Sequence, residues 1–387
     1  LRQIEAYSTE DCNEISDFSY WQISNPIFWN KYNQIYSETK LNQSLLDNIS
    51  FLTSELKNTY HIQFGTKLVL RLIFIRYLID RGVDLDYGNF STDISQSQKE
   101  FLRIVSNKHD VYKLFAHLKE KFNGNLFELE DEIDCTELTA QIFALLSDFF
   151  SGKEILNTKQ LSLFALYDFN IIPVELISNI YEILLGKEAR DKDNAFYTPN
   201  YLVEYILDRT VTKTLKEKSS FTILDPSCGS GVFLVDSYRR IIQENLGERL
   251  YCDDDAVLKR LLTNHIYGID INEEAIDVTI FSLYLTILDY KDPKTLSEFK
   301  GENLFVGDFF DEEKLRPLTE KNIAFDYIIG NPPWGNVKTG LHMSYCKSKG
   351  FADKQQNNEI SRSFVFRAKD FCTVNTTCCF ILHSKLL

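Results

Sequence analysis

The segment Phe221 to Leu234 constrains the fold of this chain more than any other segment. An apolar run of strand length, Phe221 to Asp225, leads directly into a turn with Gly229 and Gly231, and apolar residues then open a helix. The two glycines let the backbone pass close to a ligand without a Cβ in the way, and the first helical turn offers N–H groups. Leu234 replaces the third glycine of a dinucleotide-binding turn, which favours a smaller zwitterionic ligand over a pyrophosphate.

Two further apolar runs each end in an acidic residue. The run from His265 ends in Asp270, after which Asn272 to Ala275 open a helix that runs toward Asp289. An acid at the tip of the second strand of such a unit is suited to bind the hydroxyls of a ribose, so Asp270 predicts a nucleoside ligand. Helix capping is the alternative role for Asp270. The run from Asn303 ends in Asp308, which is either a contact for the adenine of that nucleoside or a solvated loop carboxylate.

The spacing between the glycine turn and the ribose acid is unusually long. Gly231 and Asp270 are 39 residues apart, whereas the usual distance is about 20 residues. We therefore expect the segment Gly247 to Lys259 to loop out or to add a helix.

A fourth apolar run, Phe325 to Gly330, leads into Asn331-Pro332-Pro333-Trp334. The side-chain oxygen of Asn331 and a carbonyl of the following proline can both accept hydrogen bonds from one amino group, while Trp334 stacks on the ring that carries it. Two acceptors pull a delocalised aromatic amine toward a tetrahedral, nucleophilic shape, which is the chemistry of N-methylation. A strand followed by a proline-stiffened loop is the structural alternative.

These runs predict an α/β fold with a Rossmann-like, doubly wound sheet, preceded by a mainly α-helical domain. The region Phe18 to Lys187 is mostly helical by pattern, and Leu68 to Asp80 is apolar nearly all round, which predicts a buried helix. We expect residues 1–187 to form the helical domain with a connector, and residues 188–387 to form the α/β domain. A fifth strand is expected at Cys379 to His383.

In their order along the chain, four motifs resemble those of the S-adenosylmethionine-dependent DNA adenine-N6 methyltransferases of the gamma order. They are Asn194-Ala-Phe-Tyr-Thr-Pro199, Asp225-Pro-Ser-Cys-Gly-Ser-Gly231, Gly268-Ile-Asp270 and Gly330-Asn-Pro-Pro-Trp334. The region from Tyr167 also looks like the connector and methylase of type IIG restriction-modification enzymes and related phage-defence methylases. The resemblance implies a set of cofactor-binding residues, namely Tyr197, Thr198, Pro199, Asp225, Pro226, Gly229, Gly231, Asp270 and Asp308. It also implies that Asn331, Pro332, Pro333 and Trp334 hold a flipped-out adenine of double-stranded DNA.

The function that this resemblance implies is site-specific transfer of a methyl group from S-adenosylmethionine to adenine N6, by direct displacement and without a metal. A protein-glutamine or RNA-guanine N-methyltransferase is an alternative within the same enzyme class. A catalytically silent S-adenosylmethionine-binding scaffold of a defence complex is the alternative from another class.

Charge and composition constrain the partners and the compartment. The chain carries a net charge of −14, yet from Gly335 onward eight Lys or Arg residues face three acids, a net of +5 against −19 on residues 1–334. This basic segment follows the catalytic turn and favours DNA there. No run has the length of a membrane span, and eight cysteines without a C-x-x-C pair fit a cytoplasmic protein. Because the chain begins at Leu1, contains only Met343 as methionine and ends near the fifth strand, we expect it to be truncated before a target-recognition domain.

Overall fold

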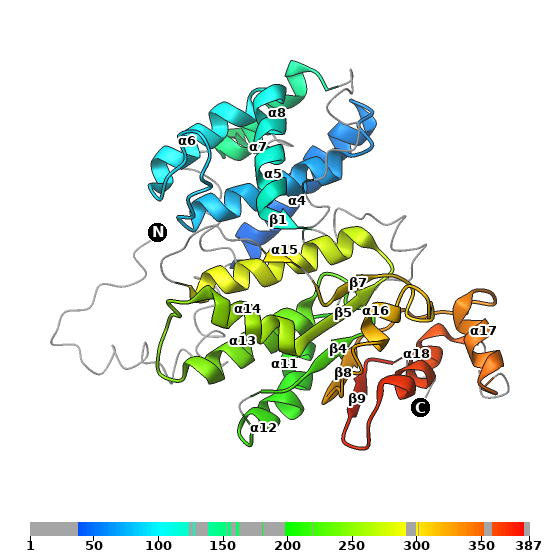
Figure 1. Cartoon of the computed structure of the whole chain (residues 1–387). Helices are drawn as coiled ribbons and strands as arrows, with labels where there is room; N and C mark the ends of the chain where they lie inside the picture. Colours follow the sequence, from blue (N-terminus) through cyan, green and yellow to red (C-terminus); the bar gives the residue numbers. More distant parts are fainter. Residues whose placement is uncertain are drawn as a thin grey trace, which may run out of the picture.

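The computed structural model of the chain describes residues 38–123, 127, 138–152, 154–155, 160–161, 180, 198–218, 220–291, 299–300, 302–351 and 358–382. Within these residues, helices gather in the amino-terminal part and a five-stranded sheet forms in the carboxy-terminal part (Figure 1). The expected boundary between residues 187 and 188 lies outside the described residues, so the two-domain division stays a prediction.

The described amino-terminal helices are α4 (Glu38–Asn58), α5 (Gly65–Asp80), α6 (Ile94–Val105), α7 (Lys108–Lys121) and α8 (Ala140–Ser151). Helix α5 is buried along nearly its whole length, as its all-round apolar sequence predicted. Two of its charges pair within the helix, since Arg76 Nε lies 2.8 Å from Asp80 Oδ1 one turn later. Helix α6 starts at Asp93, whose side chain accepts a hydrogen bond from Gln96 N.

The five-stranded sheet is parallel throughout, with the strand order β7-β5-β4-β8-β9. Its strands are β4 (Ile223–Asp225), β5 (Ile266–Asp270), β7 (Leu304–Val306), β8 (Tyr327–Gly330) and β9 (Thr377–Phe380). The chain builds outward from β4 to β5 and β7, and then returns to the other side of β4 for β8 and β9. The order therefore reverses between β4 and β8, which is where ligands of open α/β sheets bind.

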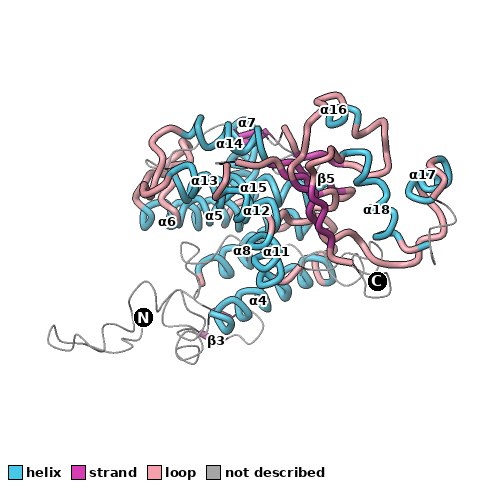
Figure 2. The backbone as a smooth tube through the Cα atoms, turned by 90° about the horizontal axis from the view of Figure 1, so that it is seen from below, coloured by secondary structure: helices cyan, strands magenta, loops and turns pink. Residues whose placement is uncertain are grey.

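Helices cover both faces of the sheet, which confirms the predicted doubly wound α/β fold. Ile223 and Ile329 enter a hydrophobic core with helices α13 (Val232–Leu246) and α15 (Glu273–Tyr290), whereas Leu224 and Ile328 enter a second core. The helices of the second core are α16 (Arg316–Thr319), α17 (Leu341–Ser348) and α18 (Ile360–Ala368). Figure 2 shows the strands between these two groups of helices.

The long segment between the glycine turn and Asp270 adds a helix, which is one of the two predicted alternatives, a loop or a helix. Helix α13 ends at Gly247, and α14 (Asp255–His265) follows and leads directly into β5. The side chain of Asp254 caps α14 by accepting from Ala256 N. The expected fifth strand, Cys379 to His383, was wrong at both ends, because β9 begins at Thr377 and ends at Phe380, with Ile381 and Leu382 outside the strand.

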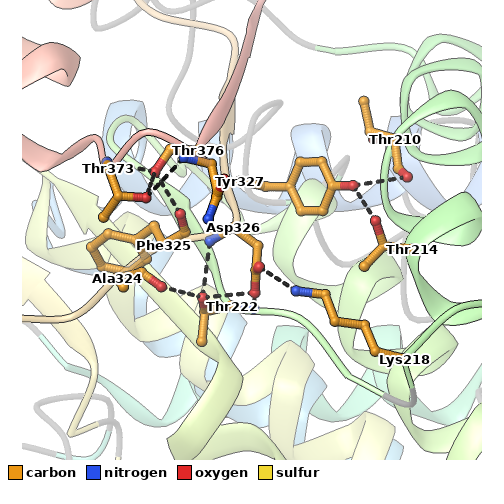
Figure 3. Close-up of polar contacts among 11 residues, drawn as sticks. Thr210, Thr214, Lys218, Thr222, Ala324, Phe325, Asp326, Tyr327, Thr373 and Thr376 are labelled. Carbon is orange, nitrogen blue, oxygen red and sulfur yellow. Dashed lines mark hydrogen bonds and ion pairs between the residues drawn. The ribbon is translucent and has the colours of Figure 1, made fainter.

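Polar side chains connect the ends of the strands opposite the Asn331 turn, which is formed by Asn331 to Trp334 (Figure 3). Asp326, just before β8, accepts from Thr222 N at 2.9 Å and from Lys218 Nζ. Tyr327 Oη donates to the carbonyl of Thr210, and Thr376 Oγ1 donates to the carbonyl of Phe325. The start of β8 is thus fixed against the segment before β4, and the start of β9 is fixed against Phe325, just before β8, which holds the strand that leads into Asn331 in register.

Candidate active site

The glycine turn and the Asn331 turn leave neighbouring strands at the point where the strand order reverses. Asp225 ends β4, and Gly330 ends β8 next to it. The two turns touch, because a Cβ on Gly330 would lie 2.5 Å from Asp225 Oδ1. Only glycine permits this close approach at position 330, so Gly330 is required by packing as well as by the motif.

The glycine turn between β4 and α13 has the left-handed backbone that its glycines allow. Gly229 has a φ of 54°, and Gly231, the N-cap of α13, has a φ of 83°. A Cβ on Gly231 would lie 2.6 Å from the Thr279 side chain, whereas a Cβ on Gly229 would have no atom within 4 Å. The turn is therefore packed on the α15 side at Gly231 and open at Gly229.

Asp270 at the tip of β5 supports the glycine turn. Its Oδ2 accepts from Gly229 N at 2.8 Å, and its Oδ1 accepts from Asn272 N at 2.8 Å. The N-cap of α15 is Asn272, whose side chain accepts from Glu274 N, so the capping role belongs to Asn272. Each carboxylate oxygen has a second lone pair, which leaves Asp270 able to accept from ribose hydroxyls.

Two buried groups of the turn are kept uncharged by their surroundings. Burial raises the pKa of the Asp225 carboxyl to about 8, against the hydrogen bond from Ser227 N that lowers it, and the Asp270 carboxylate raises it further. Burial likewise raises the pKa of the Cys228 thiol well above its ordinary value. Cys228 is thus a neutral, buried packing residue.

Asp308 lies two residues beyond β7, at the same edge of the sheet as Asp225 and Asp270. Its Oδ1 accepts from Phe310 N at 2.9 Å, which shapes the local turn. Phe309 and Phe310 fill the core beneath it. The adenine contact expected of Asp308 stays a prediction, and its carboxylate is half-buried at the strand tips.

Contacts from distant segments hold the Asn331 turn in place. Asn331 Nδ2 donates to Thr198 Oγ1 at 3.1 Å, and Trp334 Nε1 donates to the carbonyl of Ile381 at 3.2 Å. Pro332 is buried and Pro333 is half-buried, so the two prolines fill the space below the turn. Pro226 of the glycine turn is also buried.

Tyr197 lies outside the described residues, and its role stays a prediction. Thr198 is described and is buried, with 6% of its surface exposed. Pro199 follows it as the N-cap residue of α11 (Asn200–Arg209), and its carbonyl accepts from Leu202 N at 2.9 Å. The structure therefore brings Thr198 to the Asn331 turn, a contact that the sequence motif did not predict.

Sequence reasoning missed two side chains that support the site. Glu359 Oε1 accepts from Gly335 N at 2.7 Å, directly after Trp334, and Ile360 N donates to the carbonyl of Gly335. Thr279 Oγ1 donates to the carbonyl of Gly229 at 2.9 Å. Helix α15 carries three serine or threonine residues, Thr279, Ser282 and Thr286, among its apolar residues, and nothing in the sequence distinguishes Thr279 from the other two. Glu359 has no distinguishing signal in the sequence either.

The arrangement fits a nucleoside cofactor. Gly229 faces open space while its own N–H and C=O are held by Asp270 and Thr279, so a ligand can approach a fixed backbone. The Asp270 carboxylate supplies acceptors for hydroxyl groups at the same edge of the sheet. The described residues contain no group of three or more His, Cys, Asp or Glu side chains that could hold a metal ion.

Comparison with known proteins identifies relatives among restriction-modification methylases. Residues 264–387 match the family model of the Eco57I restriction-modification methylase. The chain is 24% identical over 319 residues to the type II restriction enzyme and methyltransferase RM.Eco57I of Escherichia coli, which covers 68% of this chain and 29% of that protein. It is 30% identical over 190 residues to the adenine-specific methyltransferase PglX of Streptomyces coelicolor, which covers 40% of this chain and 16% of that protein.

The fold has a close match among solved structures. The type IIL restriction-modification enzyme MmeI, solved in complex with DNA, superposes with a TM-score of 0.60 at 17% identity, over 88% of this chain and 50% of that one. The chain spans less than a third of the length of the two curated relatives. The resemblance to the DNA adenine methyltransferases is confirmed, because residues 264–387 match the family model of the Eco57I restriction-modification methylase and the similar proteins are restriction-modification and adenine-specific methyltransferases.

Proposed function

We propose that the protein is an S-adenosylmethionine-dependent DNA methyltransferase that modifies adenine at N6 in a restriction-modification or phage-defence system. One observation carries the proposal, namely the contact between the glycine turn and the Asn331 turn at the ends of β4 and β8. Methyl transfer requires a cofactor and an acceptor amine side by side, and this contact brings together the two segments that would hold them. The methylase relatives support the same chemistry.

The residues that would hold the cofactor are those at the tips of β4, β5 and β7. Asp270 would accept from the ribose hydroxyls, Asp308 would contact the adenine, and the open backbone at Gly229 would lie against the nucleoside. Thr198 and Pro199, with Tyr197, would line the methionine end by resemblance to the family. When bound, S-adenosylmethionine supplies an electrophilic methyl group on a positively charged sulfur.

The Asn331 turn would bind and activate the target amine. The Asn331 side-chain oxygen and the Pro332 carbonyl accept its two N–H groups and favour a tetrahedral nitrogen, while the half-buried Trp334 presents a stacking face. The turn is held by Thr198, Glu359 and Ile381 before any substrate arrives. Such preorganised acceptors need no rearrangement during the reaction, which is the main source of catalysis in a displacement of this kind.

A DNA substrate requires that the target base leave the duplex, because adenine N6 is paired and stacked there. We expect the phosphates to approach the basic segment after Trp334, in which Lys338 and Lys347 are exposed. Such a substrate would require a cytoplasmic location. The helices of the described residues include none that is long and apolar enough to cross a bilayer.

Transfer of labelled methyl groups tests the proposal. The whole protein that contains this chain is incubated with labelled S-adenosylmethionine and DNA, and the DNA is digested and separated into nucleosides. We expect the label in N6-methyladenine. Label in a protein glutamine or in RNA guanine would replace DNA with one of the alternative acceptors. Cofactor binding without transfer to any acceptor would support the silent scaffold.

Substitution of Asn331 separates chemistry from binding. We expect Asn331→Ala to lower the rate of methyl transfer by about 100-fold or more, because an acceptor aimed at the reacting amine is lost. Cofactor affinity, measured by calorimetry, stays nearly unchanged. Asn336→Ala, which removes an exposed asparagine just beyond the turn, is the matched control and leaves both properties intact. Loss of cofactor affinity in Asn331→Ala would mean that the turn has a structural role.

A further inference from the structure

The side chain of Asn331 is held at its nitrogen end. Nδ2 donates to Thr198 Oγ1 at 3.1 Å, between residues 133 positions apart in the chain. Thr198 is buried and Asn331 is half-buried, so water is largely excluded from the contact. The hydrogen bond therefore joins the segment before α11 to the turn after β8 in surroundings where its geometry is well defined.

The two ends of an asparagine amide are not interchangeable in this reaction. The oxygen accepts hydrogen bonds from the target amine, whereas the nitrogen carries two hydrogens and would oppose it. A rotation of the Asn331 side chain by half a turn about its last bond exchanges the two ends. In the structure Thr198 Oγ1 accepts from the nitrogen end, which leaves the oxygen end directed to the other side.

We propose that Thr198 is a positioning residue of the Asn331 turn, which holds the Asn331 side chain by its amide nitrogen and so keeps the side-chain oxygen in place to meet the target amine. The inference rests on the proposed function and deepens it. It gives the Thr198 hydroxyl a role in the chemical step, in place of the cofactor contact that the family resemblance implies.

The support of Thr198 itself is rigid enough for this role. Pro199 restricts the backbone directly after it, and the Pro199 carbonyl accepts from Leu202 N and Val203 N in the first turn of α11. Val203, Ile206 and Leu207 of α11 are buried. Helix α11 packs against α13, which starts at the glycine turn, so the hydroxyl is carried by the same framework that carries the cofactor loop.

Two substitutions distinguish a positioning role from a cofactor contact. Thr198→Val keeps the shape and removes the acceptor, whereas Thr198→Ser keeps the hydroxyl. In the whole protein, we expect Thr198→Val to lower kcat at saturating S-adenosylmethionine and DNA by about 10- to 100-fold, as a misplaced reacting group does. The Kd for S-adenosylmethionine, measured by calorimetry, changes by less than about twofold, and Thr198→Ser regains most of kcat. Thr319→Val, at an exposed threonine of α16, is the control and leaves kcat and Kd unchanged.

A double-mutant cycle tests the hydrogen bond without relying on activity. Thr198→Val and Asn331→Ala are combined, and the denaturant midpoint of unfolding is measured for both single variants and the double variant. We expect the double variant to shift the midpoint by less than the sum of the single shifts, because both substitutions remove the same contact. The double variant should also be no slower in methyl transfer than Asn331→Ala.

Two results would overturn the proposal. A weaker affinity for S-adenosylmethionine in Thr198→Val, with kcat at saturation unchanged, would assign Thr198 to the cofactor alone. Additive shifts in the unfolding cycle would mean that the two side chains act independently. If the unsubstituted protein transfers no methyl group to any acceptor, the proposed function fails, whereas the unfolding cycle still tests the link between Thr198 and Asn331.

Discussion

Asp225 connects the two turns of the site at the level of single atoms. Its carboxyl is almost fully buried, accepts from Ser227 N at 3.0 Å, and lies against Gly330 in front of Asn331. Burial raises its pKa to about 8, and Asp270 is the nearby charge that adds to the rise. The folded protein therefore holds a proton on Asp225 at neutral pH, whereas the unfolded chain does not.

This proton makes the stability of the protein depend on pH. The pKa of Asp225 rises from 3.8 to about 8 on folding, so between these values the folded state binds the extra proton. Stability consequently falls as the pH rises through this range, and the loss is complete above the folded pKa. We expect Asp225→Asn to remove this contribution, on the order of a few kcal/mol between pH 5 and 8. Denaturant unfolding of both proteins at several pH values is the measurement, and parallel profiles would contradict the expectation.

Asp270 offers a second test at the residue scale. We expect Asp270→Ala to weaken binding of S-adenosylmethionine by about 1.5–3 kcal/mol, through the loss of hydrogen bonds to a charged acceptor. Asp270→Asn keeps one oxygen and loses less affinity. Because Asp270 also holds Gly229 N, circular dichroism and unfolding of both variants must accompany the calorimetry. Unchanged affinity in Asp270→Ala would remove Asp270 from the cofactor site.

Among the strands and helices, strand β8 determines where the Asn331 turn lies. Its carboxyl end carries Asn331, and its amino end is held by the polar contacts of Asp326 with Thr222 and Lys218 (Figure 3). The strand is only four residues long, so a shift at one end reaches the other end directly.

Removal of the Asp326 carboxylate should weaken this anchor. We expect Asp326→Ala to lower the free energy of unfolding by about 1–3 kcal/mol, because Thr222 N then lacks its acceptor. Lys218→Ala is the matched control and should cost about 0–1 kcal/mol, since the Lys218 side chain is 55% exposed. Burial alone would raise the pKa of Asp326, but the hydrogen bonds from Lys218 and Thr222 hold it below its ordinary value. The stabilisation is therefore present near neutral pH and is lost as the pH falls through the folded pKa. Equal losses in the two variants would contradict this account.

The sequence predicts some of the strands and contacts and not others. Strands β4, β5, β7 and β8 were predictable because each lies in an apolar run that ends in a glycine or an acid. These residues lie at the carboxyl ends of the strands, where the two turns meet. The start of β9 was not, because this edge strand is half exposed and begins with polar Thr377, whose N–H donates to the carbonyl of Asp326. The contacts of Thr198, Thr279 and Glu359 were not predictable either, because residues far apart in the chain make them and no local pattern records such pairs.

At the scale of the whole molecule, the described helices of the amino-terminal part pack against the α/β part through α15. Phe74 of α5 stacks on Phe281 with ring centroids 3.8 Å apart, and Arg81 Nε lies 3.1 Å from Asp289 Oδ1. Strand β1 (Phe122–Asn123) pairs in parallel with β6 (Phe299–Lys300). Helix α15 also carries Thr279, so the helix that supports the glycine turn is itself supported by the amino-terminal helices.

The charge of the whole molecule opposes DNA, and the structure reduces the positive charge that the sequence suggested. Arg367, one of the eight basic residues after Trp334, is buried and pairs with Asp370 at 2.7 Å and Glu312 at 3.4 Å. Lys349 lies 3.9 Å from Asp370. Lys338 and Lys347 are exposed and remain available to phosphates. Among the described residues of this segment, the exposed positive charge is therefore smaller than the sequence suggested, on a chain of net charge −14.

We expect the 387-residue polypeptide to bind unrelated DNA duplexes with similar and weak affinity, in the range of about 10⁻⁴–10⁻⁶ M that phosphate contacts alone give. Affinity should fall steeply as salt is added, because binding rests on released counterions, and stacking on Trp334 tolerates any base. Gel-shift titrations with several duplexes at two salt concentrations measure both properties. Lys338→Gln combined with Lys347→Gln should make the affinity depend less steeply on the salt concentration. Arg367→Gln cannot serve as a control, because that residue is buried. One duplex bound at nanomolar affinity, with the others ignored, would mean that this part of the protein reads base edges itself.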